Sequence, residues 1–85
     1  MAARTVSFTP AAARALLRLP ANLARTIRAK IDQLAADPAA LANNIAVLKG
    51  SPFSRLRVGN YRVIFTSDLV VLTVVRIGHR KDVYE

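Results

Sequence analysis

The stretch "SRLRVGNYRVIF", residues 54–65, predicts a β-hairpin. Residues 54–58 alternate between polar and apolar side chains, and residues 61–65 are rich in β-branched and aromatic ones. Between them, Gly59-Asn60 is a two-residue hairpin signal. These residues therefore fix the centre of an antiparallel sheet.

The hairpin is the first part of a longer meander. Ser67-Asp68 supplies a second turn, and the apolar run that follows, residues 69–77, predicts a third strand. This run is far too short to span a bilayer. The C-terminal half of the chain is therefore expected to consist of strands.

The N-terminal half has the composition of helices. Residues 5–8 predict a short strand that leads into a helix over residues 11–19. Thr9 is suited to be the N-cap of this helix, and Pro10 to be its first residue. Pro20 then forces a break.

A second helix is predicted over residues 21–36. Its apolar residues recur at intervals of four, four and three, and so share one face: Leu23, Ile27, Ile31 and Leu34. Asp37-Pro38 ends this helix, because the residue before a proline avoids the helical conformation. The two helices are expected to form a hairpin.

The order of these elements, β-α-α-β-β-β, indicates the α+β class. We expect a single domain, residues 1–85, in which an antiparallel sheet carries the N-terminal helical hairpin on one face. A chain of this length buries only about 60–65% of its unfolded surface, which limits it to one core.

The composition narrows the partners and excludes several kinds of site. Thirteen Lys and Arg against five Asp and Glu give a net charge of +8, which favours a nucleic acid, an acidic membrane surface or an acidic protein. The chain has no cysteine, one histidine and no metal-ligand spacing among its carboxylates, so neither a metal nor another cofactor is expected. Without a signal-peptide stretch at its N-terminus, the protein is expected to be cytoplasmic and not to enter a membrane.

Arginines gather on one face of the predicted sheet. A period of two places Arg55 and Arg57 on the face that the helices leave uncovered, with Arg62 from the hairpin partner. Arg80 follows the last strand and is expected to reach the same surface. Guanidinium groups bind phosphate bidentately, so this cluster predicts a site for a phosphate-bearing ligand. The alternative is a set of solvated arginines.

The segments "LKG", "FSRLRVGNYRVIF" and "VVRIGHRKDVYE" resemble the RelE/ParE superfamily of toxins from type II toxin–antitoxin systems. The ending "GHRKDVY" is similar to that of the RelE-like branch, and the resemblance extends over the whole chain. It implies a RelE-like fold and a metal-independent endoribonuclease, an mRNA interferase, that cuts messenger RNA in the ribosomal A site and inhibits translation. Plasmid stabilization is a further expected role.

The resemblance also implies partners. A cognate antitoxin, RelB-like or of another type II class, is expected to silence the toxin, in a toxin–antitoxin heterotetramer. Messenger RNA and the ribosome are the expected targets.

Residue by residue, the resemblance implies a catalytic basic residue at Arg55, phosphate-contacting arginines at Arg62 and Arg80, and a tail tyrosine at Tyr84. Three further basic residues are expected to bind RNA: Lys49, Arg57 and Lys81. Phe53 departs from the family pattern, since RelE-type enzymes can carry a lysine there. The identity of the general base is therefore open.

His79 and Tyr84 are the remaining candidates for chemistry. Cleavage of RNA without a metal needs proton transfer as well as positive charge at the phosphate, and an arginine keeps its proton. Imidazole titrates near neutrality, which makes His79 a candidate acid or base. Against this role, strand alternation puts His79 on the face opposite to Arg80 unless the chain has left the sheet, and the alternative is a structural histidine. Tyr84 is expected to stack on a splayed base or to contribute its phenol, with packing on the sheet edge as the alternative.

Two other functions fit the same residues. One is a ParE-like toxin that poisons DNA gyrase without cutting RNA, and the other is a basic RNA-binding domain without catalysis. ParE-type members commonly lack the full arginine and tyrosine set. Its presence in this chain favours the RelE-like function.

Overall fold

The computed structural model describes residues 3–83 of the chain. It contains two α-helices, a 3₁₀-helix and five strands, in the order β1 (Thr5–Phe8), α1 (Pro10–Arg18), α2 (Ala21–Ala36), η1 (Pro38–Asn44), β2 (Ile45–Val47), β3 (Ser54–Val58), β4 (Tyr61–Ser67) and β5 (Val71–His79). The expected α+β class, with a helical hairpin before a sheet, is confirmed.

The five strands form one mixed sheet in the order β1-β5-β4-β3-β2. Successive strands from β2 to β5 pair antiparallel, as expected, but β1 pairs parallel to β5. The expectation of a wholly antiparallel sheet is corrected at this one strand. Tight hairpins force neighbouring strands to alternate in direction, whereas the two helices after β1 free it from that constraint.

Two short elements between α2 and β3 were missing from the sequence-based expectation. η1 occupies Pro38–Asn44 and buries Leu41, and β2 adds Ile45–Val47 to the edge of the sheet beside β3. Neither a single stretch of 3₁₀-helix nor three residues of strand is long enough to produce a periodic pattern.

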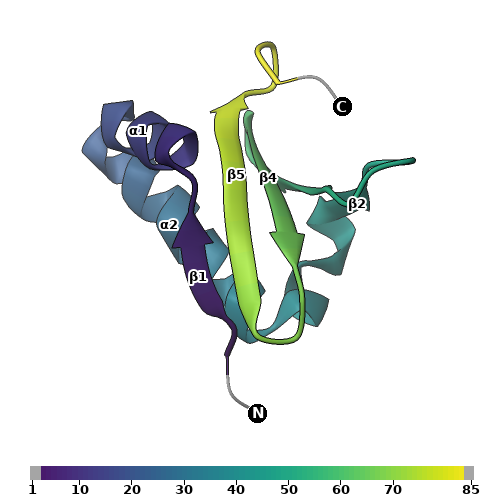
Figure 1. Ribbon diagram of the computed structural model, residues 1–85. Coiled ribbons are helices and arrows are strands. Elements are labelled where there is room, and N and C mark those ends of the chain that lie inside the picture. The colour runs from purple at the N-terminus through teal and green to yellow at the C-terminus, as the bar shows by residue number, and fades with distance from the viewer. Residues whose placement is uncertain (1–2, 84–85) are drawn as a thin grey trace.

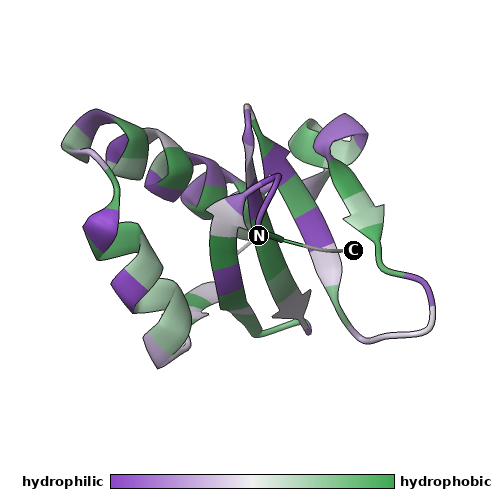
Figure 2. Ribbon diagram, turned by 90° about the horizontal axis from the view of Figure 1, so that it is seen from above, coloured by the Kyte–Doolittle hydropathy of each residue, from purple (hydrophilic) through white to green (hydrophobic). Residues whose placement is uncertain are grey.

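The core lies between the helical hairpin and one face of the sheet. Figure 1 shows α1 and α2 side by side next to β1, with β5 and β4 in the middle of the sheet. Three of the four residues of the predicted α2 stripe, Ile27, Ile31 and Leu34, are fully buried there, and Leu23 is half-buried. Along the strands, hydrophilic segments interrupt hydrophobic ones (Figure 2). The sheet therefore has one apolar face and one charged face.

Thr9 connects the start of α1 to the middle of β5. Its side-chain oxygen accepts a hydrogen bond from Ala12 N at 3.2 Å, and Pro10 takes the first helical position, so the predicted cap is confirmed. The same hydroxyl donates to the carbonyl oxygen of Val75 at 2.7 Å, and the backbone N–H of Thr9 donates to Val74 O at 3.0 Å. One residue thus fixes the helix and a strand 66 positions away.

A β-bulge interrupts the pairing of β4 with β5. Ile64 pairs with Arg76, but the next residue, Phe65, pairs with Val74, which leaves Val75 as the extra residue. An extra residue shifts the alternation of side chains between the two faces of the sheet. In β5 the buried positions accordingly run Leu72, Val74 and then Ile77.

The turns on either side of β4 follow from their residues. Gly59 has a φ of +57°, which is the conformation that the first position of a two-residue type II′ hairpin turn requires. In the second turn, the Asp68 carboxylate accepts hydrogen bonds from Val71 N and Val70 N, both at 2.7 Å, and these two bonds lower its pKa. β5 therefore begins at Val71 and not at residue 69 as expected.

Within residues 3–83, no helix is both long enough and apolar enough to cross a membrane.

The Thr9 hydroxyl gives the first prediction. Thr9→Ala removes the cap of α1 and leaves the bulge carbonyl of Val75 without its hydroxyl donor, so we expect a loss of about 2–4 kcal/mol in the free energy of unfolding. Thr9→Ser keeps both hydrogen bonds and should lose less than about 1 kcal/mol. Urea denaturation of the three proteins measures this difference, and equal stability of the Ala and Ser variants would contradict it.

Candidate functional site

Five arginines lie on the face of the sheet that is turned away from the helices. We call this surface the arginine face and define it by Arg55, Arg57, Arg62, Arg76 and Arg80. Its residues form two rows across the strands. Paired residues share a face, so the first row contains Arg57, Arg62 and Gly78.

The second row crosses the same strands two residues earlier on β3. It contains Arg55, Ile64 and Arg76. The residue between the two rows on β3 is Leu56, which is fully buried in the core on the other face. The alternation along β3 and β4 is thus the one expected from the sequence.

Arg62 is held over the hairpin turn. Its Nη1 donates to the carbonyl oxygens of Gly59 at 3.1 Å and of Tyr61 at 3.0 Å. Partial burial lowers the pKa of Arg62, and the positive charges of Arg55, Arg57 and Arg80 lower it further. Arg55, Arg57 and Arg80 therefore lie close enough to Arg62 for their charges to repel it, and a phosphate anion would offset this repulsion.

Arg80 reaches this cluster because the chain turns back after β5. The backbone N–H of Arg80 donates to Asn60 O at 2.8 Å, which brings the residue to the β3–β4 turn. Asp82 N and Val83 N both donate to the carbonyl oxygen of His79, at 2.8 Å and 3.2 Å. Figure 1 shows this yellow segment turning beyond the ends of β5 and β4.

His79 lies on the opposite side of the sheet from the arginines. It pairs with Tyr61, and their rings meet edge to face with centroids 5.4 Å apart. Tyr61 in turn packs against the hydrophobic core. The Nδ1 atom of His79 accepts a hydrogen bond from Lys81 N at 3.2 Å. In this arrangement His79 holds the turn that carries Arg80 and is not directed at the arginine face.

The other predicted residues are distributed unevenly. Lys81 is exposed in the turn beside Arg80. Lys49 is exposed in the loop between β2 and β3, at the end of β3 that is remote from the Gly59 turn, so the structure does not bring it to Arg62. Tyr84 lies outside the described residues.

Arg76 is the member of the arginine face that the sequence analysis missed. Its Nη2 donates to the carbonyl oxygen of Asp82 at 3.2 Å, so it also supports the turn after β5. Unbroken alternation from Leu72 and Val74 would have placed Arg76 in the core. A charged residue at an expected core position was therefore the available signal of the bulge.

The arginine face has the charge and the hydrogen-bond donors that an extended polyanion requires. Guanidinium groups on neighbouring strands present planar pairs of donors to phosphate oxygens, and their charge does not depend on pH near neutrality. Within the described part of the chain, no group of three or more His, Asp or Glu side chains is placed to hold a metal ion.

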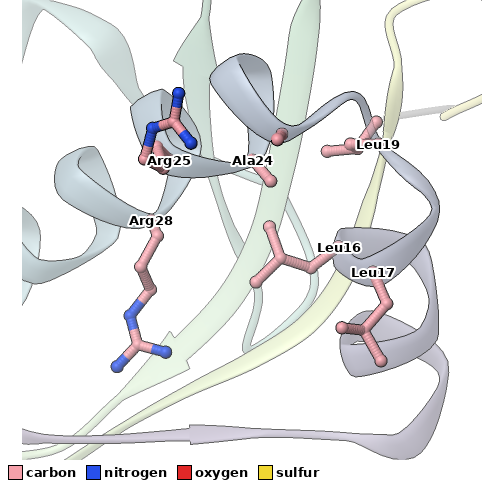
Figure 3. A pocket seen from close by; sticks show the side chains of 7 residues that line it. Leu16, Leu17, Leu19, Ala24, Arg25 and Arg28 are labelled. Atoms are coloured by element: carbon pink, nitrogen blue, oxygen red, sulfur yellow. The ribbon is translucent and has the colours of Figure 1, made fainter.

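A second surface feature is an apolar groove between α1 and α2. It has a volume of about 370 Å³ and is lined by seven residues: Leu16, Leu17, Leu19, Ala21, Ala24, Arg25 and Arg28. Figure 3 shows Leu16 reaching from α1 toward Ala24 on α2, with Arg25 and Arg28 extending from α2 beside the groove. Leu17 is 86% exposed, which is unusual for a leucine on a helix that packs on a core.

The sequence matches the family model of the ParE toxin of the type II toxin–antitoxin system parDE over residues 6–84. No curated protein matches the chain in sequence.

Several solved structures have a similar fold. The toxin–antitoxin complex RelBE2 from Mycobacterium tuberculosis contains a chain with a TM-score of 0.78 and 24% identity, and the match covers 93% of this chain and 100% of that one. The archaeal RelE–RelB complex from Pyrococcus horikoshii gives a TM-score of 0.79 at 23% identity, covering 96% and 100%. The intact Escherichia coli RelBE complex gives 0.76 at 20% identity, covering 91% and 96%.

The repulsion within the arginine face gives the second prediction. Sulfate that binds the folded protein should stabilise it, by about 1.4 kcal/mol at ten times the dissociation constant. Arg57→Gln should reduce this gain, because Arg57 is exposed and contributes to the field at Arg62.

Thermal unfolding in sodium sulfate and in sodium chloride at equal ionic strength measures the effect. Arg14→Gln, on the exposed side of α1, is the matched control and shares the general stabilisation by sulfate. If Arg57→Gln and Arg14→Gln kept the same sulfate gain as the parent, the arginine face would not be an anion site.

Proposed function

The chain belongs to the ParE toxin family of type II toxin–antitoxin systems, in the RelE/ParE superfamily, and from this premise we propose that it is an endoribonuclease that cuts messenger RNA on the ribosome. The protein is a toxin, and its expected place of action is the cytoplasm. Cleavage of messages stops translation without any metal ion in the reaction.

The convergence of arginines on Arg62 is the observation that carries this proposal. Arg57 pairs with Arg62 across the hairpin, Arg55 lies two residues before Arg57 on β3, and Arg80 follows β5 at the same turn. Cleavage of a phosphodiester adds negative charge to the phosphate in the transition state. Preorganised cations at that position stabilise the transition state more than the ground state.

Each residue of the arginine face has a separate role in this proposal. Arg62 and Arg80 bind the scissile phosphate, because both are held at the Gly59-Asn60 turn. Arg55 is the catalytic basic residue of β3, and two exposed neighbours, Arg57 and Lys81, bind flanking phosphates.

The other candidates act at a greater distance. Tyr84 is assigned to stacking on a base, as the sequence implies. Lys49 is assigned to a more distant part of the RNA, since it follows the remote end of β3. His79 is assigned to holding the turn and not to proton transfer, because its ring packs against Tyr61 and its Nδ1 atom accepts from Lys81 N.

The proposed partner is a RelB-like antitoxin. RelB chains accompany the toxins in the similar complexes from Mycobacterium tuberculosis and Pyrococcus horikoshii. The groove between α1 and α2 suits an amphipathic helix with acidic residues, because its apolar floor lies beside Arg25 and Arg28. Two toxins and two antitoxins would form the heterotetramer.

A second candidate function is inhibition of DNA gyrase without RNA cleavage. It is favoured by the family model, which describes ParE toxins and matches residues 6–84. A gyrase poison needs a protein-binding surface but no set of cations around one phosphate. The arginine face therefore distinguishes the two functions when its residues are changed one at a time.

The third prediction concerns Arg62. Arg62→Ala should slow RNA cleavage about 10²–10³-fold, by analogy with the loss of one preorganised donor to a developing negative charge. Primer extension on a message bound to ribosomes, after a single turnover, measures the rate. Arg14→Ala on α1 is the control and should cut at the parental rate.

Three outcomes separate the candidate functions. Breaks within codons that need ribosomes and disappear with Arg62→Ala support the endoribonuclease. Intact RNA together with stalled replication selects the gyrase poison. Normal cleavage by folded Arg62→Ala would remove Arg62 from the site.

The fourth prediction concerns the antitoxin. Association with a chain of charge +8 should be steered by electrostatics, so its rate constant should fall by about tenfold or more between low and physiological salt. Arg25→Gln should slow association through the groove, whereas Arg62→Gln, on the other side of the sheet, should leave the groove intact. Stopped-flow mixing with the purified antitoxin measures both variants. A larger effect of Arg62→Gln would move the antitoxin to the arginine face.

A further inference from the structure

We propose that an apolar hollow on the arginine face binds one base of the RNA whose phosphates lie on the neighbouring arginines. The inference deepens the proposed function and rests on it. The hollow has a volume of about 250 Å³ and is lined by six residues: Leu48, Phe53, Ile64, Val75, Arg76 and Val83.

The hollow is separate from the hydrophobic core. Ile64 and Val83 are only 6% and 4% exposed, yet neither belongs to the core cluster between the helices and the sheet. The register places Ile64 on β4 between Arg55 on β3 and Arg76 on β5. The arginine face thus has an apolar patch of its own, bordered by guanidinium groups.

Three parts of the chain build the walls. The bulge contributes Val75, the extra residue of β5. The loop between β2 and β3 contributes Leu48 and Phe53, which are joined by a hydrogen bond from Leu48 N to Phe53 O of 3.0 Å. The turn after β5 contributes Val83, which packs directly over Gly78.

Gly78 is necessary for that closure. A Cβ atom at position 78 would lie 2.5 Å from Cγ2 of Val83, which is closer than two carbon atoms approach without displacement. The absence of a side chain at Gly78 therefore lets the turn lie flat on the sheet. The wall of the hollow and the position of Arg80 depend on the same contact.

The size and chemistry of the hollow fit a nucleobase. Its volume is below the range of about 300–1,000 Å³ that holds drug-sized ligands, so it suits one ring system and not a whole nucleotide. Phe53 supplies an aromatic ring and Arg76 a guanidinium plane, and both kinds of group stack on bases of single-stranded RNA.

The position of the hollow connects it to the phosphate site. Neighbouring strands lie about 4.8 Å apart, so Ile64 is one strand spacing from Arg55 and one from Arg76. A base over Ile64 therefore leaves its own phosphate within reach of the arginines. An apolar side chain of a protein partner would also fit the hollow, whereas a nucleotide supplies in addition a phosphate for the guanidinium groups beside it.

Binding of a nuclease-resistant RNA tests the base site apart from cleavage. The probe is a fully 2′-O-methylated hexaribonucleotide, compared with six versions that each lack one base. For the full-length protein, one abasic version should bind about 5- to 160-fold more weakly than the intact probe, which is the range for losing one stacked base.

Variants locate the effect. Phe53→Ala should bind the intact probe as weakly as the parent binds that abasic probe. The variant should bind the abasic probe no more weakly than it binds the intact one. Phe53→Leu, which keeps an apolar wall, should show the same loss of discrimination if the ring stacks. Leu69→Ala is the control, since Leu69 is 90% exposed in the turn before β5. Thermal midpoints check that each variant is folded.

Each outcome decides between specific alternatives. If the parent binds the intact probe and every abasic probe equally, or binds none of them, there is no base site. If Phe53→Ala keeps full discrimination, the base lies elsewhere on the surface.

Failure of the proposed function would give a different pattern of RNA binding from failure of the base site. Arg55→Gln should weaken the intact and abasic probes by the same factor, because it removes a phosphate contact. Both proposals fail if two results coincide. The first is that Arg55→Gln binds the probes as the parent does, and the second is that an antitoxin fragment binds the parent in the hollow but does not bind Phe53→Ala. The hollow would then be a protein-docking site.

Discussion

The hydroxyl group of Thr9 makes the hydrogen bonds that position the rest of the molecule. It accepts from Ala12 N at the start of α1 and donates to the carbonyl oxygen of Val75 in the bulge of β5. A bulge leaves one residue outside the regular pairing, and its carbonyl needs another donor. The Thr9 side chain and its backbone N–H, which donates to Val74 O, thereby join the helical hairpin to β5 at the bulge.

The two faces of the sheet contribute differently to the stability of the fold. One face buries Leu56, Val63 and Ile77 with the helices and supplies the stability of a chain that has room for only one core. The other face gathers the arginines, and burial together with the positive charges of its neighbours lowers the pKa of Arg62. Under the proposed function, a bound phosphate would offset this repulsion and so increase its own affinity.

Local signals in the sequence were sufficient for most of the fold. α2 occupies Ala21–Ala36 as expected, because prolines mark both of its ends and its apolar residues keep one period. The hairpin at Gly59 is equally local. Two features depend on contacts between distant residues, and no periodic pattern predicts them. They are the parallel pairing of β1 and the short strand β2. Arg76 was missed because one charged residue at an expected core position does not locate a bulge until the pairing of β4 with β5 is known.

The bulge at Val75 adds one residue to β5 without changing which of its neighbours face the core. Leu72 and Val74 face the core before it, and Ile77 faces the core after it. Another apolar side chain at position 75 leaves this order in place. Loss of Val75 would leave Val74, Arg76 and Ile77 in simple alternation, with Arg76 still on the arginine face and Ile77 still in the core. The order of the two faces therefore does not require the bulge, which instead supplies the carbonyl oxygen that accepts from Thr9 and one wall of the hollow.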